Sequence, residues 1–421
     1  MSSQSCNLLN IIPPKPKPPF SPANIVVDND DLLIEILLRL PIKSLLRFRS
    51  VSKHWLSLIS NPQFSRLRTH VSPSGLILRS LSLSYKNPRF NFVDFNPNPI
   101  NFAPSRGPFE TLTFFDDPLG IKILQSCNGL LLCSSSTSEH YNFCKTRYYV
   151  YNPSTKQYSV LPPLNSHGGF WRVRGFCLAF DPSKSPHYKV VCLWKGGFNY
   201  TSRHLIEIYS SQDGQWSVST SFTASLNVEF DCGVFWNGAV HWLNKWENSV
   251  YFKVDEEQVR DLPMPSMEHH DDGWNHRRIE YFGESNDHLH LIEIYWPWTT
   301  KFDVYEMKRD HSGWFVKYHV DLTSVSIAFP DIVREDLPRN SWNYYDFSIF
   351  SVIRGGPSGD SFLVMNIFGK VVRYNFEDRS FRKLGARVIV SRAIDLAIEK
   401  AQVLCAVDYC KSLFTFYLGS V

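Results

Sequence analysis

Few residues in this sequence have the types and spacing of a metal-binding or reactive site. His269 and His270 precede two aspartates, and His288 and His290 stand two residues apart. Imidazole and carboxylate groups are common zinc ligands. However, the first group falls in a polar stretch between predicted strands, and the second lies on one face of an alternating strand. We therefore expect solvated positions for both groups, with no metal and no cofactor.

The sequence also lacks the short motifs that carry common chemistry. It contains no GxGxxG, GxxxxGK[ST], HExxH or GxSxG, and so gives no support for a dinucleotide, P-loop, zinc-protease or hydrolase site. Its nine cysteines are odd in number and include no CxxC pair. This pattern indicates reduced, buried thiols in the cytoplasm or nucleus rather than a secreted disulfide framework. We expect a protein that is not an enzyme.

The amino-acid composition further limits the kinds of partner and the fold class that we expect. Lys and Arg total 44 against 40 Asp and Glu, for a net charge of +4, which argues against nucleic acid or an anionic membrane as the main partner. No apolar stretch approaches the ~20 residues that span a bilayer. Aromatic residues make up 15% of the chain and charged residues only 20%. These proportions favour β-structure with many small cores.

The first 70 residues divide into a tail and a helical segment. Six prolines lie between Pro13 and Pro22, so residues 1–27 are expected to form an extended, disordered tail. Asp28 or Asn29 can then cap a helix. Apolar residues recur at helical spacing after the cap and end at a proline: Leu32, Leu33, Ile36, Leu37, Leu40 and Pro41.

A second helix is predicted from about Ser44, followed by a short helical turn. The apolar positions of the helix are Leu45, Phe48, Val51, Trp55 and Leu58, and the turn carries Phe64 and Leu67. Three short helices in residues 28–70 bury little surface by themselves. Many of these large side chains therefore need a surface outside the segment, which predicts a docking element.

From about residue 71 a hairpin pattern repeats. Two large apolar residues, mostly aromatic, flank a polar turn, usually seven positions apart: Phe95 with Phe102, Tyr151 with Tyr158, Tyr209 with Trp216, Phe252 with Val259, Tyr305 with Trp314 at a longer spacing, and Tyr374 with Phe381. The hairpins follow one another at or above the ~40–50 residues typical of four-stranded propeller blades. Residues 71–421 are therefore predicted to form a mainly β propeller.

The two ends of the repeat region suggest how the ring closes. The first strand, GLILRSLSL from Gly75, has too little sequence before it for a full blade, and the last segment, KSLFTFYLGSV, has no blade after it. Pairing these two segments would remove both exposed edges. The sequence leaves six and seven blades open.

Two stretches resemble known families. ILLRLPIKSLLRFRSVSKHWLSLISNPQF, which begins at Ile36, is similar to the F-box, a small all-α three-helix domain. SCNGLLLC and YYVYNPSTKQYSVLPPL resemble the F-box-associated domain of plant F-box proteins, a divergent relative of the kelch propeller. The resemblance covers residues 28–421, with the F-box at 28–70 and a kelch-like β-propeller of six or seven blades at 71–421.

The resemblance implies the substrate receptor of a Skp-cullin-F-box ubiquitin ligase. Its F-box would bind the Skp-type adaptor, and through it a cullin, by Leu32, Ile36, Leu37, Leu40, Pro41, Leu45, Leu46, Phe48, Val51 and Trp55. The family usually opens with Leu-Pro, where this chain has Asp28-Asn29. Three alternatives stay open: a helical bundle that merely caps the propeller, an interaction scaffold without a ligase, and, more weakly, a sugar-active or oxidase propeller.

Blade geometry suggests where a target protein would bind. The long connections between strands 2 and 3 and between blades should emerge on one face. They carry residue types that are common at binding hot spots: Trp171, Arg172, Arg174, Trp274, Arg277, Trp296 and Trp298. We hypothesise that this face binds an unidentified target protein, although packing against its own blade is the commoner role for any single one of these side chains.

Overall fold

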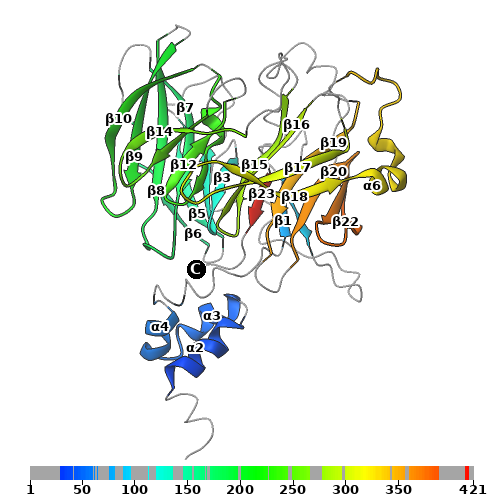
Figure 1. The fold of residues 1–421 in the computed structure, drawn as a ribbon. Helices are drawn as coiled ribbons and strands as arrows, with labels where there is room; N and C mark the ends of the chain where they lie inside the picture. The colour runs from blue at the N-terminus through cyan, green and yellow to red at the C-terminus, as the bar shows by residue number, and fades with distance from the viewer. Residues whose placement is uncertain are drawn as a thin grey trace, which may run out of the picture. The chain divides into compact units, whose positions relative to one another are not determined.

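The computed structural model describes residues 29–40, 42–59, 61, 64, 75–80, 89–95, 112, 120–135, 146–153, 156–165, 167, 171–197, 201–225, 227–244, 249–265, 277–295, 299–341, 344–355, 360–387 and 413–416. The chain divides into two compact units, Met1–Phe64 and Ser65–Val421, and Figure 1 shows helices in the first and mainly strands in the second. No helix among the described residues is both long and apolar enough to cross a membrane.

The first unit contains three short helices: α2 (Asp30–Leu38), α3 (Ile42–Phe48) and α4 (Lys53–Ile59). Asn29 caps α2, because its Oδ1 accepts hydrogen bonds from the backbone N–H groups of Asp31 and Leu32 at 3.1 and 3.2 Å. The Ser52 hydroxyl accepts from the N–H of Trp55 in the same way, at 3.1 Å. Because Ser52 starts a new helix, the single long second helix predicted from sequence is wrong, and two helices stand in its place.

A small apolar core holds this unit together. It is formed by Leu33, Leu37, Leu45, Leu58 and Phe64. Phe48 packs edge-to-face on Trp55, with ring centroids 5.2 Å apart, and both rings lie against the core. One side of each helix is therefore used inside the unit.

The described part of the second unit contains five four-stranded antiparallel sheets, which we number as blades I to V. Blade I contains β3 (Ile121–Cys127), β4 (Leu130–Ser135), β5 (Tyr148–Asn152) and β6 (Gln157–Val160). Blade II contains β7 (Arg172–Ala179), β8 (Lys189–Gly196), β9 (Thr201–Ser210) and β10 (Gln215–Ser225). Blade III contains β11 (Val234–Trp236), β12 (Ala239–Trp242), β13 (Ser249–Lys253) and β14 (Gln258–Leu262).

The last two blades are separated by short helical segments. Blade IV contains β15 (Arg277–Ser285), β16 (His288–Tyr295), β17 (Lys301–Met307) and β18 (Trp314–Asp321). Blade V contains β19 (Phe347–Ile353), β20 (Phe362–Ile367), β21 (Lys370–Asn375) and β22 (Phe381–Arg387). Helix α6 (Thr323–Ala328) and the 3₁₀ turn η4 (Pro330–Ile332) lie between these blades, and η2 (Phe230–Cys232) precedes blade III.

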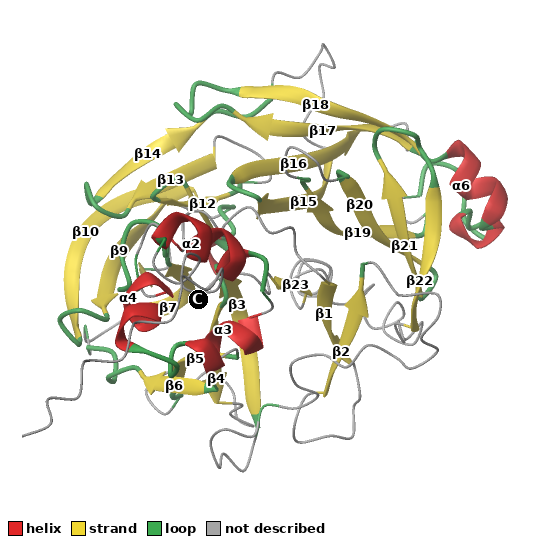
Figure 2. Ribbon diagram, turned by 90° about the horizontal axis from the view of Figure 1, so that it is seen from below, coloured by secondary structure: helices red, strands yellow, loops and turns green. Residues whose placement is uncertain are grey.

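A three-stranded sheet joins the two ends of the second unit. It has the order β2-β1-β23, from β1 (Gly75–Ser80), β2 (Arg89–Asp94) and β23 (Leu413–Phe416). The predicted pairing of the first strand with the C-terminal segment is confirmed, because β1 and β23 run antiparallel with Gly75 opposite Phe416. β23 contacts β3 and β2 contacts β22, so the sheets follow one another around a ring (Figure 2).

The predicted hairpin repeat is largely confirmed. Tyr151 lies opposite Tyr158, Tyr209 opposite Trp216, Phe252 opposite Val259 and Tyr374 opposite Phe381. In blade IV the predicted pairing of Tyr305 with Trp314 is wrong, because Trp314 lies opposite Met307, which is seven positions earlier as in the other hairpins. Phe102, the predicted partner of Phe95, lies outside the described residues.

Hydrogen bonds between neighbouring blades recur at equivalent places. The asparagines that open the turns after β3, β11 and β15 have positive φ angles, and their side-chain amides donate to carbonyls of the following blade: Asn128 to Phe180, Asn237 to Arg309 and Asn286 to Gly355. The indole N–H groups of Trp216 and Trp314 donate to the carbonyls of Pro162 and Pro263 at 2.9 and 2.8 Å. These bonds fix blade I against II, blade III against IV and blade IV against V.

The antiparallel order gives the ring two distinct faces. Turns between strands 1 and 2 and between strands 3 and 4 leave a blade on one face, which we call the turn face. Connections between strands 2 and 3 and between blades leave on the other, which we call the loop face. The starts of β7 and β9 and the end of β8 therefore lie together at the loop face.

Four cysteines, Cys127, Cys133, Cys177 and Cys192, are buried and unpaired, which agrees with reduced structural thiols. Burial raises the pKa of Cys177 to about 12. Its thiol therefore stays protonated at neutral pH and does not behave as a nucleophile.

Candidate binding surfaces

Large apolar side chains remain exposed on the helical unit. Leu32 is 46% exposed and Ile36 is 45% exposed, and they stand one turn apart on α2. Val51 and Leu56 are exposed as well. Beside this apolar strip, Arg39 and Glu35 form an exposed ion pair, and His54 lies 2.9 Å from the carboxylate of Asp30. The unit thus carries an apolar surface that its own core does not cover.

The side chains predicted to contact an adaptor differ in their exposure to solvent. Leu32, Ile36 and Val51 are exposed, as a docking surface requires. Leu37 and Leu45 are buried in the unit's core, so their predicted place on the contact surface is wrong: they face inward because α2 and α3 pack against α4.

The other predicted contacts are intermediate or undescribed. Leu40, Phe48 and Trp55 are half-buried against the core. Pro41 and the side chain of Leu46 lie outside the described residues. Sequence reasoning missed Leu56, which is exposed on α4 next to Trp55 and carries no signal beyond its apolar type.

On the second unit, several cations meet at the loop-face end of blade II. We call these cations, together with the adjacent Trp171, the cationic edge: Trp171, Arg172, Arg174, Lys195 and Arg203. Arg172 begins β7 and lies directly opposite Lys195 at the end of β8. Arg203, near the start of β9, lies opposite Gly196. Three of the predicted target-binding residues, Trp171, Arg172 and Arg174, are therefore brought together, with Lys195 and Arg203 added by neighbouring strands.

The cationic edge has a firm support on one side. The ring of Trp171 covers Gly196, where a Cβ atom would lie only 3.1 Å from the ring atoms. Behind it, the buried carboxylate of Glu207 accepts hydrogen bonds from Trp194 Nε1 at 2.8 Å and Asn165 Nδ2 at 3.1 Å. His167 Nε2 lies 3.0 Å from the same carboxylate, and its ring contacts that of Trp171. These contacts thus hold the side chains of Asn165, His167 and Trp171 in place next to β7.

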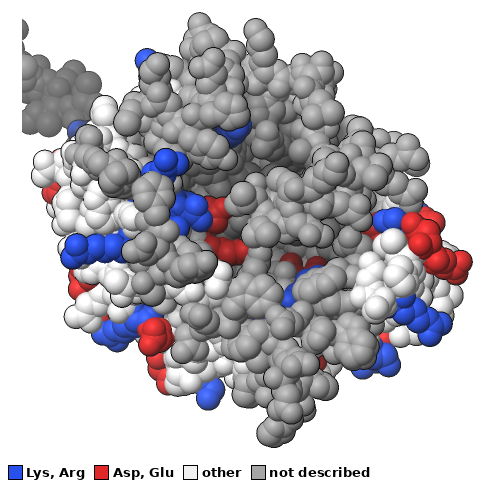
Figure 3. Space-filling view, turned by 90° about the horizontal axis from the view of Figure 1, so that it is seen from above, with Lys and Arg blue, Asp and Glu red and all other residues white. Residues whose placement is uncertain are grey.

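The cations of this edge have no anionic partner within the described ranges. No ion pair connects Arg172, Arg174, Lys195 or Arg203 to a described carboxylate. Burial lowers the pKa of Lys195, and the positive charge of Arg174 lowers it further, so the two cations are close enough to repel each other. On the face drawn in Figure 3, basic and acidic side chains lie close to one another at several places.

Blade IV places its charges differently. Arg277, predicted on an exposed loop, instead begins β15 with its side chain 2% exposed and ion-paired to Glu293. That expected exposure is wrong, because Glu293 on β16 holds the guanidinium inside the blade. Tyr295 also donates to Glu293, at 2.6 Å. Trp274, Trp296 and Trp298 lie outside the described residues.

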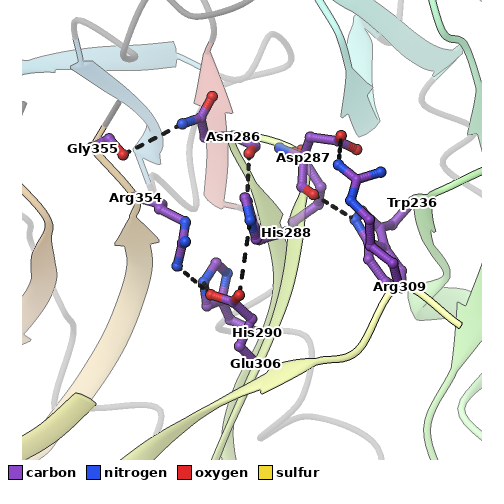
Figure 4. A network of polar contacts seen from close by, with 10 residues as sticks. Trp236, Asn286, Asp287, His288, His290, Glu306, Arg309, Arg354 and Gly355 are labelled. Carbon is purple, nitrogen blue, oxygen red and sulfur yellow. Dashed lines mark hydrogen bonds and ion pairs between the residues drawn. The ribbon is translucent and has the colours of Figure 1, made fainter. Parts of the chain in front are cut away.

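A polar network lies at the turn-face end of blade IV (Figure 4). Glu306 on β17 is ion-paired with Arg354, and it lies 3.6 Å from Nε2 of His290 and 3.8 Å from Nε2 of His288. His290 is fully buried, so the solvated strand position expected for it is wrong. Burial lowers the pKa of both histidines. Among the described residues, no group of three or more His, Cys, Asp or Glu side chains has a metal-binding arrangement.

Comparison with known proteins identifies the class. Residues 29–67 match the F-box domain, and residues 84–330 match the F-box associated beta propeller domain. An F-box protein of Arabidopsis thaliana is 39% identical over 380 residues, which cover 86% of this chain and 87% of that protein. A second F-box protein of the same plant is 27% identical, over 72% of this chain and 81% of its own length. The chain belongs to the plant F-box proteins that carry an F-box-associated β-propeller.

Two solved structures illustrate distant matches. The fucoside-bound Aleuria aurantia lectin is 9% identical, covers 76% of this chain and 97% of its own, and has a TM-score of 0.34. A Fusarium graminearum α-L-arabinofuranosidase is 15% identical, covers 62% of this chain and 79% of its own, and also has a TM-score of 0.34.

Proposed function

We propose that this protein is the substrate receptor of a Skp-cullin-F-box ubiquitin ligase. The observation that carries the proposal is the pair of half-exposed apolar side chains Leu32 and Ile36, one turn apart on α2 and outside their unit's core. Burying a side chain of this size is worth about 1.5–3 kcal/mol, which a partner surface would supply. The F-box match supports a Skp-type adaptor as that partner.

The proposed mechanism is placement rather than catalysis. The helical unit binds the adaptor and through it a cullin, while the loop face of the ring binds a target protein. A ubiquitin-charged conjugating enzyme brought by the cullin then transfers ubiquitin to a lysine of the target. The chain itself makes no covalent bond and raises the local concentration of the reacting groups.

We infer further details of organisation on the same basis. The three-stranded sheet counts as a sixth blade, because it fills the place between blades I and V. A Pro-rich tail at 1–27, an F-box at 28–70 and a propeller at 71–421 remain the proposed boundaries. Kelch-like character and a location in the cytoplasm or nucleus stay predictions.

The adaptor assignment is tested with side chains that are already exposed, so that folding is not at risk. In the double variant L32S/I36S we expect affinity for a plant Skp-type adaptor to fall roughly 100-fold, from the lost burial of two side chains. The matched control is V160S/V218S, which removes two exposed apolar side chains from the ring and should bind the adaptor like wild type. Affinity is measured by surface plasmon resonance.

One outcome would favour the interaction scaffold instead. Asn29 stands where the family usually has a Leu-Pro opening, and it caps α2 here. If the wild-type chain captured target proteins from plant extract but bound neither adaptor nor cullin, the ligase assignment would be wrong.

A further inference from the structure

The cationic edge of blade II points to the chemistry of a bound partner. Arg172, Arg174 and Arg203 are exposed and Lys195 is half-buried. Arg172 lies directly opposite Lys195 on the neighbouring strand, an arrangement of like charges that weakens a sheet. The folded chain thus keeps a local repulsion that an anionic partner would relieve.

The repeat provides an internal reference for this edge. The first strands of blades II and IV carry a bulge at the same place, between Val173 and Gly175 and between Ile279 and Tyr281. The inserted residue is Arg174 in blade II and Glu280 in blade IV. Glu280 forms an ion pair with Arg278 two residues earlier, whereas Arg174 repeats the charge of Arg172. At the same backbone position, blade IV therefore carries an acid that neutralises the neighbouring arginine, whereas blade II carries a second arginine.

Carboxylates within the described part of blade II do not compensate these charges. Glu207 is fully buried and occupied by Trp194 and Asn165. The backbone of Asp231 packs against Gly175, and no ion pair between described residues includes Arg172 or Arg174. The guanidinium groups are therefore free to bind carboxylates from outside.

We propose that the cationic edge binds an acidic segment of the target protein, rich in Asp and Glu. The proposal rests on the receptor function proposed above and names the class of target. Arginine forks suit carboxylates in two-bond geometry, and Trp171, held flat on Gly196, supplies a rigid apolar floor beside them. The chain's net charge of only +4 favours a short acidic peptide over the long phosphate backbone of a nucleic acid.

The test uses the full-length chain and a fluorescein-labelled decapeptide of alternating Asp and Glu. Fluorescence anisotropy at 50 mM NaCl should show binding that weakens as salt increases, because exposed charges are screened. The double variant R172A/R174A should bind the peptide ~tenfold more weakly. A matched control, K308A/K383A, removes two exposed cations of the ring that form no ion pair with a described residue, and should retain wild-type affinity.

A third variant uses the design of blade IV. R174E places an acid two residues after Arg172, as Glu280 follows Arg278, so the edge should neutralise itself and peptide binding should fall at least as far as in R172A/R174A. Unchanged peptide affinity in R172A/R174A, or an equal loss in K308A/K383A, overturns the proposal. Binding of a ten-nucleotide oligothymidine as tight as that of the peptide overturns it as well.

The test separates this inference from the proposed function. R172A/R174A should bind the Skp-type adaptor like wild type, because both arginines lie in the second unit. If the chain binds the adaptor normally but does not bind the acidic peptide, only the acidic-segment inference is wrong. Failure of the wild-type chain to bind the adaptor removes the receptor function, whatever the peptide does.

Discussion

Blades II and IV share one framework and use their charges in opposite ways. Both have four strands, a bulge in the first strand and a tryptophan in the fourth that donates to a proline carbonyl of the preceding connection. Blade IV pairs the two cations at the start of its first strand internally, Arg277 with Glu293 and Arg278 with Glu280. In blade II, Arg172 and Arg174 form no ion pair with any residue that the structure describes. Apolar and hydrogen-bonding positions therefore define the blade, and the charged positions are free to differ.

The bulge in the first strand shows this variation in residue type. Four first strands carry an inserted residue at the same place: Leu124 in blade I, Arg174 in blade II, Glu280 in blade IV and Phe350 in blade V. The four side chains include an exposed leucine and a buried phenylalanine. Because the bulge accommodates apolar, basic and acidic side chains alike, the type of the inserted residue can be selected for function.

The largest expected difference between the two blades is in stability. Arg277→Ala should lower the free energy of unfolding by about 3–5 kcal/mol, because it leaves the buried Glu293 carboxylate without its cation. Arg277→Lys keeps the charge and should lose less. Both are measured by urea denaturation, with R172A as the matched control in blade II. A loss in R277A no larger than that in R172A would show that blade IV does not depend on its internal pairs.

A second effect depends on pH. His311, from the turn after β17, reaches into blade III, where its Nε2 lies 2.9 Å from that of His241. Burial, with the charge of His311 second, lowers the pKa of His241 to about 3. Since the unfolded chain takes up this proton near pH 6.5 and the folded chain does not, stability is complete above pH 6.5 and is lost as pH falls toward 3.

Urea denaturation at pH 7 and pH 5 measures this contribution. From the difference between the two pKa values, the wild-type chain should lose about 2 kcal/mol more than His241→Gln over that interval. Equal losses in the two proteins would remove His241 as the source.

A third prediction concerns the framework that the two blades share. Trp216→Phe and Trp314→Phe each remove one hydrogen bond to a proline carbonyl and should each cost about 1–2 kcal/mol. Thermal unfolding should give similar shifts for both variants. A loss confined to one of them would mean that the blades are not equivalent in their framework.

The smallest expected effect is at the cationic edge. Arg174→Ala should change the free energy of unfolding by less than about 0.5 kcal/mol, and in the stabilising direction, because an exposed side chain and a repulsion from Lys195 are both removed. The measurement is again a urea series. Destabilisation beyond 1 kcal/mol would indicate that Arg174 has a structural role instead.

Repeated features could be predicted from the sequence, because they depend on local spacing. The hairpin aromatics, the helix cap at Asn29 and the pairing of β1 with β23 follow from turn chemistry, side-chain hydrogen bonding and unpaired strand edges. The blade-to-blade bonds of Asn128 and Trp216 could also have been suspected, since each residue recurs at an equivalent position in a later blade.

The distribution of side chains between core and surface could not be predicted in the same way. Ile36 and Leu37 are neighbours of the same type, but one is exposed and the other is core, because only the packing of α2 on α4 decides between them. Arg277 and Arg172 each begin the first strand of a blade, but only Arg277 is buried, because its ion-pair partner Glu293 lies on the neighbouring strand. Lys195 and Arg203 join the cationic edge only through the register of β7, β8 and β9.

The central claim is that the helical unit binds a Skp-type adaptor. Size-exclusion chromatography with multi-angle light scattering tests it directly, on the full-length chain mixed with a plant Skp-type adaptor. We expect a single species with the mass of one chain plus one adaptor. Two separate peaks with the masses of the free proteins would contradict it.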